Sequence, residues 1–254
     1  MDEEFLALLV DLHKGQQRQG PGGDAETERA ISLSNISRTE RIKVADIGCG
    51  TGASTLQLAR SLNADITAVD FLPEFIDILE SNARAEGLSG KIKPVVSSME
   101  ALPFGVEELD VIWSEGAIYN MGFRNGVTSW RRFLKPGGTL VVSEITWING
   151  ARPDDLQKYW DGEYPEIGTA SSKFAVLEEC GYAPAGYFVL PETCWLENYY
   201  APLHEQLPAF IARHAGNEKA RAVAEAEHHE LDLYRKYKAY YGYGVYIARK
   251  TATP

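Results

Sequence analysis

The chain has 254 residues, 44% of them hydrophobic, which fits one α/β domain with additional structural elements. Its net charge of −11 disfavours nucleic acid as a partner. No stretch reaches about 18 uncharged apolar residues, so no membrane span is predicted, and acidic residues stand where a signal peptide needs basic ones. Three cysteines without metal-ligand spacing predict neither a disulfide framework nor a metal site, and we expect a reducing, cytoplasmic location.

Two helices are predicted before the first strand. Apolar residues between Phe5 and Leu12 recur at helical spacing, and a second helix is expected over roughly 24–35. The intervening "RQGPGGD" at 18–24 places Pro21 among glycines and breaks the helical pattern.

Strands and helices then alternate from residue 43 to residue 147. Five strands are predicted in "IKVADIG", "DITAVD", "IKPVVS", "LDVIWSE" and "GTLVVSEITW", with helices between most of them. The first is apolar at nearly every position, which is typical of a strand that is buried on both faces. This alternation predicts a doubly wound parallel sheet.

The regular alternation of strands and helices ends after Trp147. The segments "GYFVLPETCW" and "GYGVYIARK" predict two late strands, and residues 197–240 between them read mainly as helix. We interpret this stretch as a helical insertion between the last two strands and not as a separate domain.

The segment "KVADIGCGTG" at 43–52 ends the first strand in a glycine-rich loop. Gly48, Gly50 and Ala53 satisfy the pattern G-x-G-x-x-G/A, and Asp70 follows at the end of the next strand, where an acid can bind ribose hydroxyls. The loop therefore predicts a site for an adenosine-bearing cofactor, although a tight turn alone also explains such glycines.

Asp46 helps to separate two classes of cofactor. It stands two residues before Gly48, and its carboxylate would lie close to the pyrophosphate of NAD, which charge disfavours. A carboxylate suits a ligand with an ammonium group, such as S-adenosylmethionine. The glycines also continue as G-x-G-x-G through Gly52.

The ordered motifs "VADIGCGTG", "AVD", "SSMEALPF", "LDVIWSEGAIYNMG" and "LKPGGTLVVSE" resemble those of class I S-adenosylmethionine-dependent methyltransferases, in the small-molecule branch that includes ubiquinone and menaquinone methyltransferases. The resemblance covers about residues 18–147. It implies a mostly parallel seven-stranded sheet of order 3-2-1-4-5-7-6 with strand 7 antiparallel. It also implies transfer of a methyl group from S-adenosylmethionine to a small molecule, with S-adenosylhomocysteine as product.

This resemblance implies one domain over residues 1–254. N-terminal helices and a lid would occupy 1–40, the cofactor-binding core 41–150, and the C-terminal strands 151–254, with a helical cap at about 197–240.

The resemblance also assigns cofactor contacts by position. Asp46, Gly48 and Gly50 would line the methionine end of the cofactor, and Glu115 would face its sulfonium. Asp70 would bind the ribose hydroxyls. Phe71 would lie beside the adenine, and Ser98 and Met99 would flank the edge of the adenine. Many relatives carry an aspartate where Ser98 stands, which weakens the expected contact with the adenine amine.

The segment "RQGPGG" has two interpretations that stay open. It can be a lid over the cofactor, with Arg18 meeting the cofactor carboxylate and with Gln19 and Gly20 bonding it by side chain and backbone. It can equally be a helix-breaking linker.

Methyl transfer by in-line displacement depends mostly on alignment, so the reaction does not require an obvious catalytic base. The candidate catalytic residues lie in the tail of the fourth strand, where Tyr119 and Asn120 could orient the acceptor and Glu115 could take a proton. This tail is not of the Asn-Pro-Pro-Tyr type that nucleic-acid amino methyltransferases use.

The late aromatic residues are candidates for an acceptor pocket. They are Trp147, Trp195, Tyr199 and Tyr200, which could form a wall for a flat or cationic acceptor, with core packing as the alternative. The "EHHE" run at 227–230 is expected to be a solvated helix face. The expected partner is a small-molecule acceptor, and a homodimer stays open. A non-catalytic S-adenosylmethionine-binding module and a nicotinamide-dependent oxidoreductase are the two alternative functions.

Overall fold

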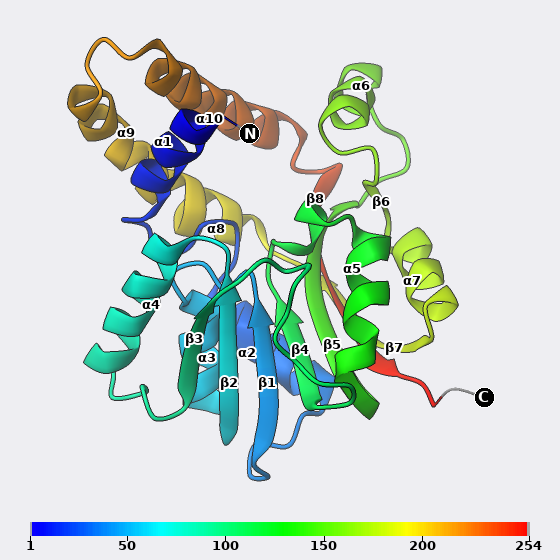
Figure 1. Cartoon of the computed structure of the whole chain (residues 1–254). Helices are drawn as coiled ribbons and strands as arrows, with labels where there is room; N and C mark the ends of the chain where they lie inside the picture. The colour runs from blue at the N-terminus through cyan, green and yellow to red at the C-terminus, as the bar shows by residue number, and fades with distance from the viewer. Residues whose placement is uncertain (1, 253–254) are drawn as a thin grey trace.

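A mostly parallel sheet runs through the centre of the computed structural model, which describes residues 2–252 (Figure 1). The strands are β1 Ile42–Ile47, β2 Ala64–Asp70, β3 Ile92–Val96, β4 Leu109–Ser114, β5 Leu134–Trp147, β6 Gly168–Thr169, β7 Tyr182–Val189 and β8 Tyr241–Lys250. Their order is β3-β2-β1-β4-β5-β8-β7, and β8 runs antiparallel to β5 and β7. The predicted order 3-2-1-4-5-7-6 is therefore confirmed, because β8 and β7 are its strands 7 and 6. The two-residue β6, which pairs with β5 off this path, was not predicted.

Helices cover both faces of this sheet. They are α1 Glu3–His13, α2 Asp24–Ser34, α3 Ala53–Ser61, α4 Pro73–Ala85, α5 Phe123–Trp130, α6 Asp154–Glu163, α7 Ala170–Glu179, α8 Glu192–Trp195, α9 Ala201–Arg213 and α10 Glu218–Tyr237. The alternation of side chains along β1 divides the core, since Val44 belongs to the cluster that includes buried residues of α2, α3 and α4, whereas Ala45 belongs to the cluster that includes buried residues of α5 and α7. None of the helices within residues 2–252 is both long and apolar enough to cross a membrane.

The helical insertion between the last two strands is confirmed, but its beginning differs from the prediction. The segment "GYFVLPETCW" was predicted as one strand, yet β7 ends at Val189 and α8 begins at Glu192. Pro191 explains the difference, because proline has no N–H to donate to a strand and is tolerated at the start of a helix. A π-helical segment, Leu196–Tyr200, then leads into α9.

The first helix packs with this insertion. In Figure 1, α1 lies beside α9 and α10 above the carboxyl edge of the sheet. Asp11 of α1 accepts from Arg213 at 2.8 Å and lies 3.0 Å from His214 Nε2, while His13 Nε2 lies 3.2 Å from Glu227 of α10. We call α1, α8, the π-helical segment, α9 and α10 the helical cap.

Candidate active site

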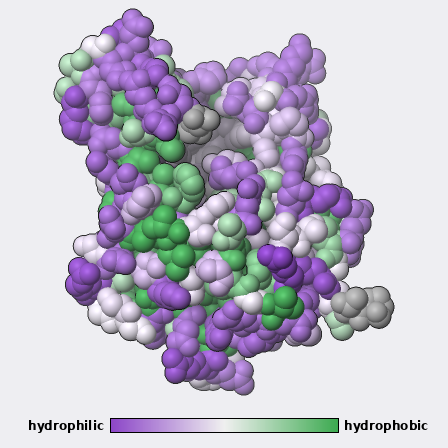
Figure 2. All heavy atoms as spheres, in the orientation of Figure 1, coloured by the Kyte–Doolittle hydropathy of each residue, from purple (hydrophilic) through white to green (hydrophobic). Residues whose placement is uncertain are grey.

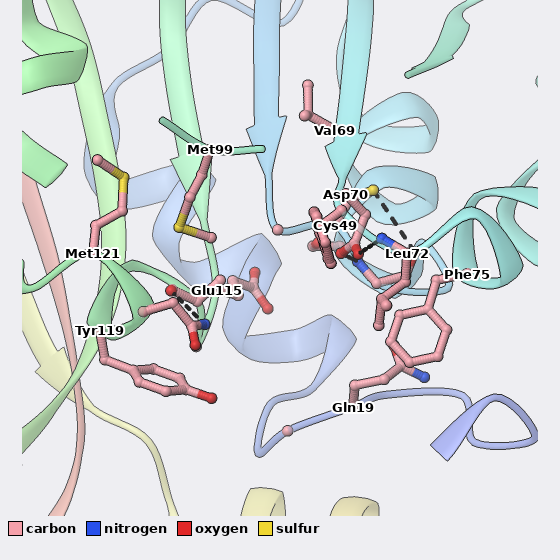
Figure 3. A pocket seen from close by; sticks show the side chains of 18 of the residues that line it. Gln19, Cys49, Val69, Asp70, Leu72, Phe75, Met99, Glu115, Tyr119 and Met121 are labelled. Carbon is pink, nitrogen blue, oxygen red and sulfur yellow. Dashed lines mark hydrogen bonds between the residues drawn. The ribbon is translucent and has the colours of Figure 1, made fainter. Parts of the chain in front are cut away.

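A cleft of about 600 Å³ opens at the carboxyl edge of the sheet, below the helical cap. It is lined by the loops that follow β1, β2, β3 and β4 and by the loop between α1 and α2. Figure 3 shows Asp70, Leu72 and Phe75 on one side of this cleft and Met99, Met121 and Tyr119 on the other. The crossover connections of a parallel sheet bring these segments to one edge, although they are far apart in the sequence.

The glycine loop forms the floor of the cleft. Gly48 and Gly50 have φ angles of +73° and +55°, which favour glycine. A Cβ on Gly48 would lie 2.3 Å from the Cβ of Ala117, and one on Gly50 would lie 2.2 Å from Oε1 of Gln19. Neither position therefore has room for a side chain, because Ala117 and Gln19 pack directly against the backbone of this loop.

Asp70 and Phe71 stand at the rim, where β2 ends. The Asp70 carboxylate accepts from the backbone N–H of Gly50 at 2.9 Å and from that of Leu72 at 3.0 Å. Burial raises its pKa despite these bonds. The side chain of Phe71 is 62% exposed, which leaves its ring free to meet a flat ligand.

The structure does not place Asp46 in the cleft. Its side chain is completely buried, and Oδ2 accepts from Ser54 at 2.8 Å and from Thr55 at 2.6 Å. The alternation along β1 explains this, because Asp46 shares the face of Val44 and points toward α3. Burial raises the pKa of Asp46 to about 7. Any contact with a ligand would pass through Ser54, which does line the cleft.

The loop between α1 and α2 is anchored at the cleft. Gln19 accepts from the backbone N–H of Thr51 at 2.9 Å and donates to the Thr51 hydroxyl at 3.0 Å. The buried guanidinium of Arg18 donates to Glu115 at 3.0 Å and to Asp24 at 2.9 Å. Arg18, Gln19, Gly20 and Pro21 all line the cleft.

Glu115 holds this loop against the sheet. Besides Arg18, its carboxylate accepts from the hydroxyl of Thr27 at 2.7 Å and from the indole N–H of Trp113 at 2.9 Å. Both oxygens therefore have strong donors, and this arrangement suits an anchor better than a general base.

The other predicted residues near the reaction centre also line the cleft. Tyr119 is 44% exposed, and its ring centroid lies 6.2 Å from that of Tyr164. Asn120 donates to the carbonyl of Ala117 at 3.0 Å. Ser98 and Met99 also line the cleft, and the Ser98 hydroxyl accepts from the N–H of Glu100 at 3.2 Å.

The four aromatic residues predicted for the acceptor pocket do not line this cleft. Trp147, Trp195, Tyr199 and Tyr200 are each at most 8% exposed and belong to the hydrophobic core. Trp195 stacks on Tyr234 with 4.3 Å between ring centroids, as expected of core packing. Tyr243, a partly exposed tyrosine of β8, lies closer to the cleft, since a Cβ on Gly116 would lie 3.8 Å from its hydroxyl.

Comparisons with known proteins agree with this geometry. Residues 44–138 match the family described as a methyltransferase domain. The chain is 23% identical to the O-methyltransferase rstn1 of Aspergillus nomiae, over 72% of this chain and 87% of the relative. It is 29% identical to the ubiquinone/menaquinone biosynthesis C-methyltransferase UbiE of Geobacter sp., over 64% of this chain and 70% of the relative.

A solved structure shares the fold over nearly the whole chain. An S-adenosylmethionine-dependent methyltransferase from Geobacter sulfurreducens, in complex with S-adenosylhomocysteine, has a TM-score of 0.82 at 16% identity and covers 97% of this chain and 98% of its own. The family match, the strand order and the glycine loop beside Asp70 together identify the chain as a class I S-adenosylmethionine-dependent methyltransferase.

Proposed function

We propose that the enzyme methylates a small molecule that reaches the cleft from beneath the helical cap. One observation carries this proposal: the cleft continues from the glycine loop to Tyr119 and Asn120, so that a cofactor site and an exposed polar tail share one cavity. When bound, S-adenosylmethionine supplies an electrophilic methyl group on a sulfonium. The residues around it need to orient the acceptor and exclude water.

The residues of the cleft fit this cofactor. We assign the ribose hydroxyls to Asp70 and the adenine to the exposed ring of Phe71, flanked by Ser98 and Met99. A Cβ on Gly20 would meet nothing within 4 Å, so its backbone faces open space and can approach a ligand.

The methionine end of the cofactor would lie between the glycine loop and the Arg18–Glu115 pair. There Arg18 would add positive charge for the cofactor carboxylate while it holds the loop in place. Tyr119 and Asn120 would orient the acceptor, and no residue needs to act as a base unless the attacking atom carries a proton.

We also propose that the partner is a small molecule and that the compartment is the cytoplasm. A net charge of −11 opposes binding to a phosphate backbone, which supports a small-molecule acceptor over nucleic acid. The cytoplasm is the compartment that three free cysteines suit best.

Calorimetry and a turnover assay test the proposed function. The protein should bind S-adenosylmethionine and S-adenosylhomocysteine and should show no comparable affinity for NAD. Incubation with a metabolite panel should then release S-adenosylhomocysteine. Equal or tighter binding of NAD would favour the oxidoreductase, and cofactor binding without turnover on any panel member would favour the non-catalytic module.

The N-terminal loop should behave as a lid. Hydrogen exchange at residues 15–24, followed by mass spectrometry, should slow when S-adenosylhomocysteine binds, because Arg18 to Pro21 line the cleft. Gln19→Ala should weaken cofactor binding, since it removes the bonds to Thr51. Gln17→Ala is the matched control, because that side chain is exposed. Unchanged exchange, together with equal affinities for both variants, would show that the segment is only a connector.

A further inference from the structure

The helical cap lies above the cofactor cleft but contributes little to its walls. Of the cap residues that the structure describes, only Leu6 of α1 lines the cleft. Figure 2 shows mostly hydrophilic residues over the visible face of the cap and hydrophobic residues below it, near the carboxyl edge of the sheet. The cap can therefore act on a bound cofactor only through Leu6 or through a segment that lies between the two.

Residues 14–23, which we call the lid loop, form such a segment, and the π-helical segment of the cap holds both of its ends. The ring of Tyr199 stacks on that of His13, the residue directly before the loop, with 6.3 Å between centroids and 9° between ring planes. At the other end, Asn198 Nδ2 donates to the carbonyl of Gly22 at 2.8 Å. Two consecutive residues of the cap therefore contact the beginning and the end of the lid loop.

Gly22 connects Asn198 to the charged pair in the cleft. A Cβ on Gly22 would lie 2.8 Å from Nη1 of Arg18 and 3.4 Å from Oε2 of Glu115, so the Gly22 backbone packs directly against this pair. Arg18 in turn donates to Glu115 at 3.0 Å. Because these contacts are so close, a shift of Gly22 away from the sheet would also free Arg18 to move.

The π-helical segment Leu196–Tyr200 presents Asn198 from a fixed position. Trp195 and Tyr200, which flank it, are 5% and 3% exposed and are buried in the core. The i→i+5 hydrogen bonds of such a segment change the helical register, and π-helical turns occur often at functional sites. The buried neighbours therefore hold Asn198 in place although its own position is exposed.

The rest of the cap is joined to the same N-terminal segment. His13 Nε2 lies 3.2 Å from Glu227 of α10, which is 8% exposed, so the predicted solvated face of the "EHHE" run is wrong for Glu227. A Cβ on Gly15 would lie 3.1 Å from Oε1 of Gln206 on α9. The lid loop thus has contacts with α9 and with the π-helical segment, and the residue before it contacts α10.

We propose that Asn198 is a positioning residue for the cofactor site and couples the lid loop to the helical cap, so that both close as one body over a bound cofactor. This inference rests on the proposed lid and extends it to α8, α9 and α10, which do not line the cleft. Asn198 acts through Gly22, because it holds the loop backbone against Arg18, the residue assigned to the cofactor carboxylate. A cofactor held by Arg18 is then released only when this body opens.

Hydrogen exchange followed by mass spectrometry tests the coupling without an acceptor. Saturating S-adenosylhomocysteine should slow exchange at residues 196–213 as well as at residues 15–24, although residues 196–213 do not line the cleft. Slower exchange at residues 15–24 alone would overturn the coupling and leave the proposed lid intact. Unchanged exchange in both segments would contradict the lid and the coupling together.

Substitutions in the π-helical segment locate the coupling. Asn198→Ala removes the bond to Gly22 and should release S-adenosylhomocysteine roughly threefold to tenfold faster in surface plasmon resonance, as expected for one hydrogen bond. It should also reduce the protection of residues 196–213. Asn198→Asp keeps the size of the side chain but cannot donate, so it should behave like Asn198→Ala. Glu197→Ala, at an exposed neighbouring position, is the matched control and should behave like the wild type.

Stability separates positioning from a general structural role. Urea denaturation without ligand should give similar free energies of unfolding for the wild type, Asn198→Ala and Glu197→Ala, because both positions are exposed. Equal release rates in the two variants, or faster release matched by an equal loss of ligand-free stability, would overturn the role of Asn198. Failure of the wild type to bind S-adenosylhomocysteine would contradict the proposed function and, with it, this inference.

Discussion

Replacing Asp70 with alanine should weaken binding of S-adenosylhomocysteine by roughly tenfold to a hundredfold, since charge-assisted hydrogen bonds contribute about 1.5–3 kcal/mol. The carboxylate stands at the rim of the cleft, where it would accept from both ribose hydroxyls. It also fixes the glycine loop through the N–H of Gly50, so the loss of Asp70 would affect both the ligand contact and the floor beneath it. Titration calorimetry of the purified variant measures the change.

Two further variants separate these contributions. Asp65→Ala removes a carboxylate from the opposite end of β2, where Asp65 pairs with Arg41 at the surface, and should leave cofactor affinity unchanged. Asp70→Asn keeps one acceptor for the backbone and should give an intermediate affinity. If Asp70→Ala binds S-adenosylhomocysteine as the wild type does while it remains folded, the ribose is held by another residue.

The parallel strands could be predicted because each is a short apolar run that ends in a polar loop, and their order followed from the resemblance to class I methyltransferases. The helices α6 and α7 could not be predicted in the same way. Leu156 is the only buried residue of α6, and the buried residues of α7 are Lys173 and Leu177, so neither helix shows an apolar stripe. Tertiary contacts, and not local pattern, hold these helices in place.

The candidate site was likewise predicted only in part. Asp70, Phe71 and Tyr119 lie at or after the ends of strands, and they line one cavity because the carboxyl ends of parallel strands meet at one edge. Asp46 lies one residue before the end of its strand, where the alternation of side chains turned it toward α3. A motif gives the position of a residue along the chain, but the direction of its side chain depends on its neighbours.

The acceptor side was harder to predict, since aromatic residues both fill cores and line pockets. Trp195 and Tyr200 resemble pocket residues in sequence, yet their side chains are buried in the hydrophobic core. Which rings are covered therefore depends on contacts between residues far apart in the sequence, such as that between Tyr159 of α6 and His229 of α10.

The second large effect is expected at a buried ion pair between β5 and α7. Lys173 of α7 lies 3.1 Å from Glu144 of β5, and their side chains are 4% and 0% exposed. The ammonium also lies 4.5 Å from the ring centroid of Phe123 and 5.5 Å from that of Tyr164. Lys173→Met should lower the free energy of unfolding by about 3–5 kcal/mol, because it leaves a buried carboxylate without its partner. Urea denaturation measures the loss.

The pH dependence shows whether the unpaired carboxylate is the cause. Burial already raises the pKa of Glu144 although Lys173 opposes the shift, so removal of the cation raises it further. A raised carboxyl pKa stabilises the fold at low pH, and this stabilisation disappears as the pH rises from the unfolded value toward the folded one. The deficit of Lys173→Met should therefore be larger at pH 8 than at pH 5.

A second substitution separates charge from packing. The double variant Glu144→Gln/Lys173→Met removes both charges, should recover most of the stability and should lose the added pH dependence. Lys158→Met, at an exposed position of α6, controls for the loss of a surface lysine and should be nearly neutral. Lys173→Met could instead lose the same amount of stability at pH 5 and pH 8, and the double variant could fail to recover it. That result would show that Lys173 stabilises α7 through the packing of its hydrocarbon chain and not through its charge.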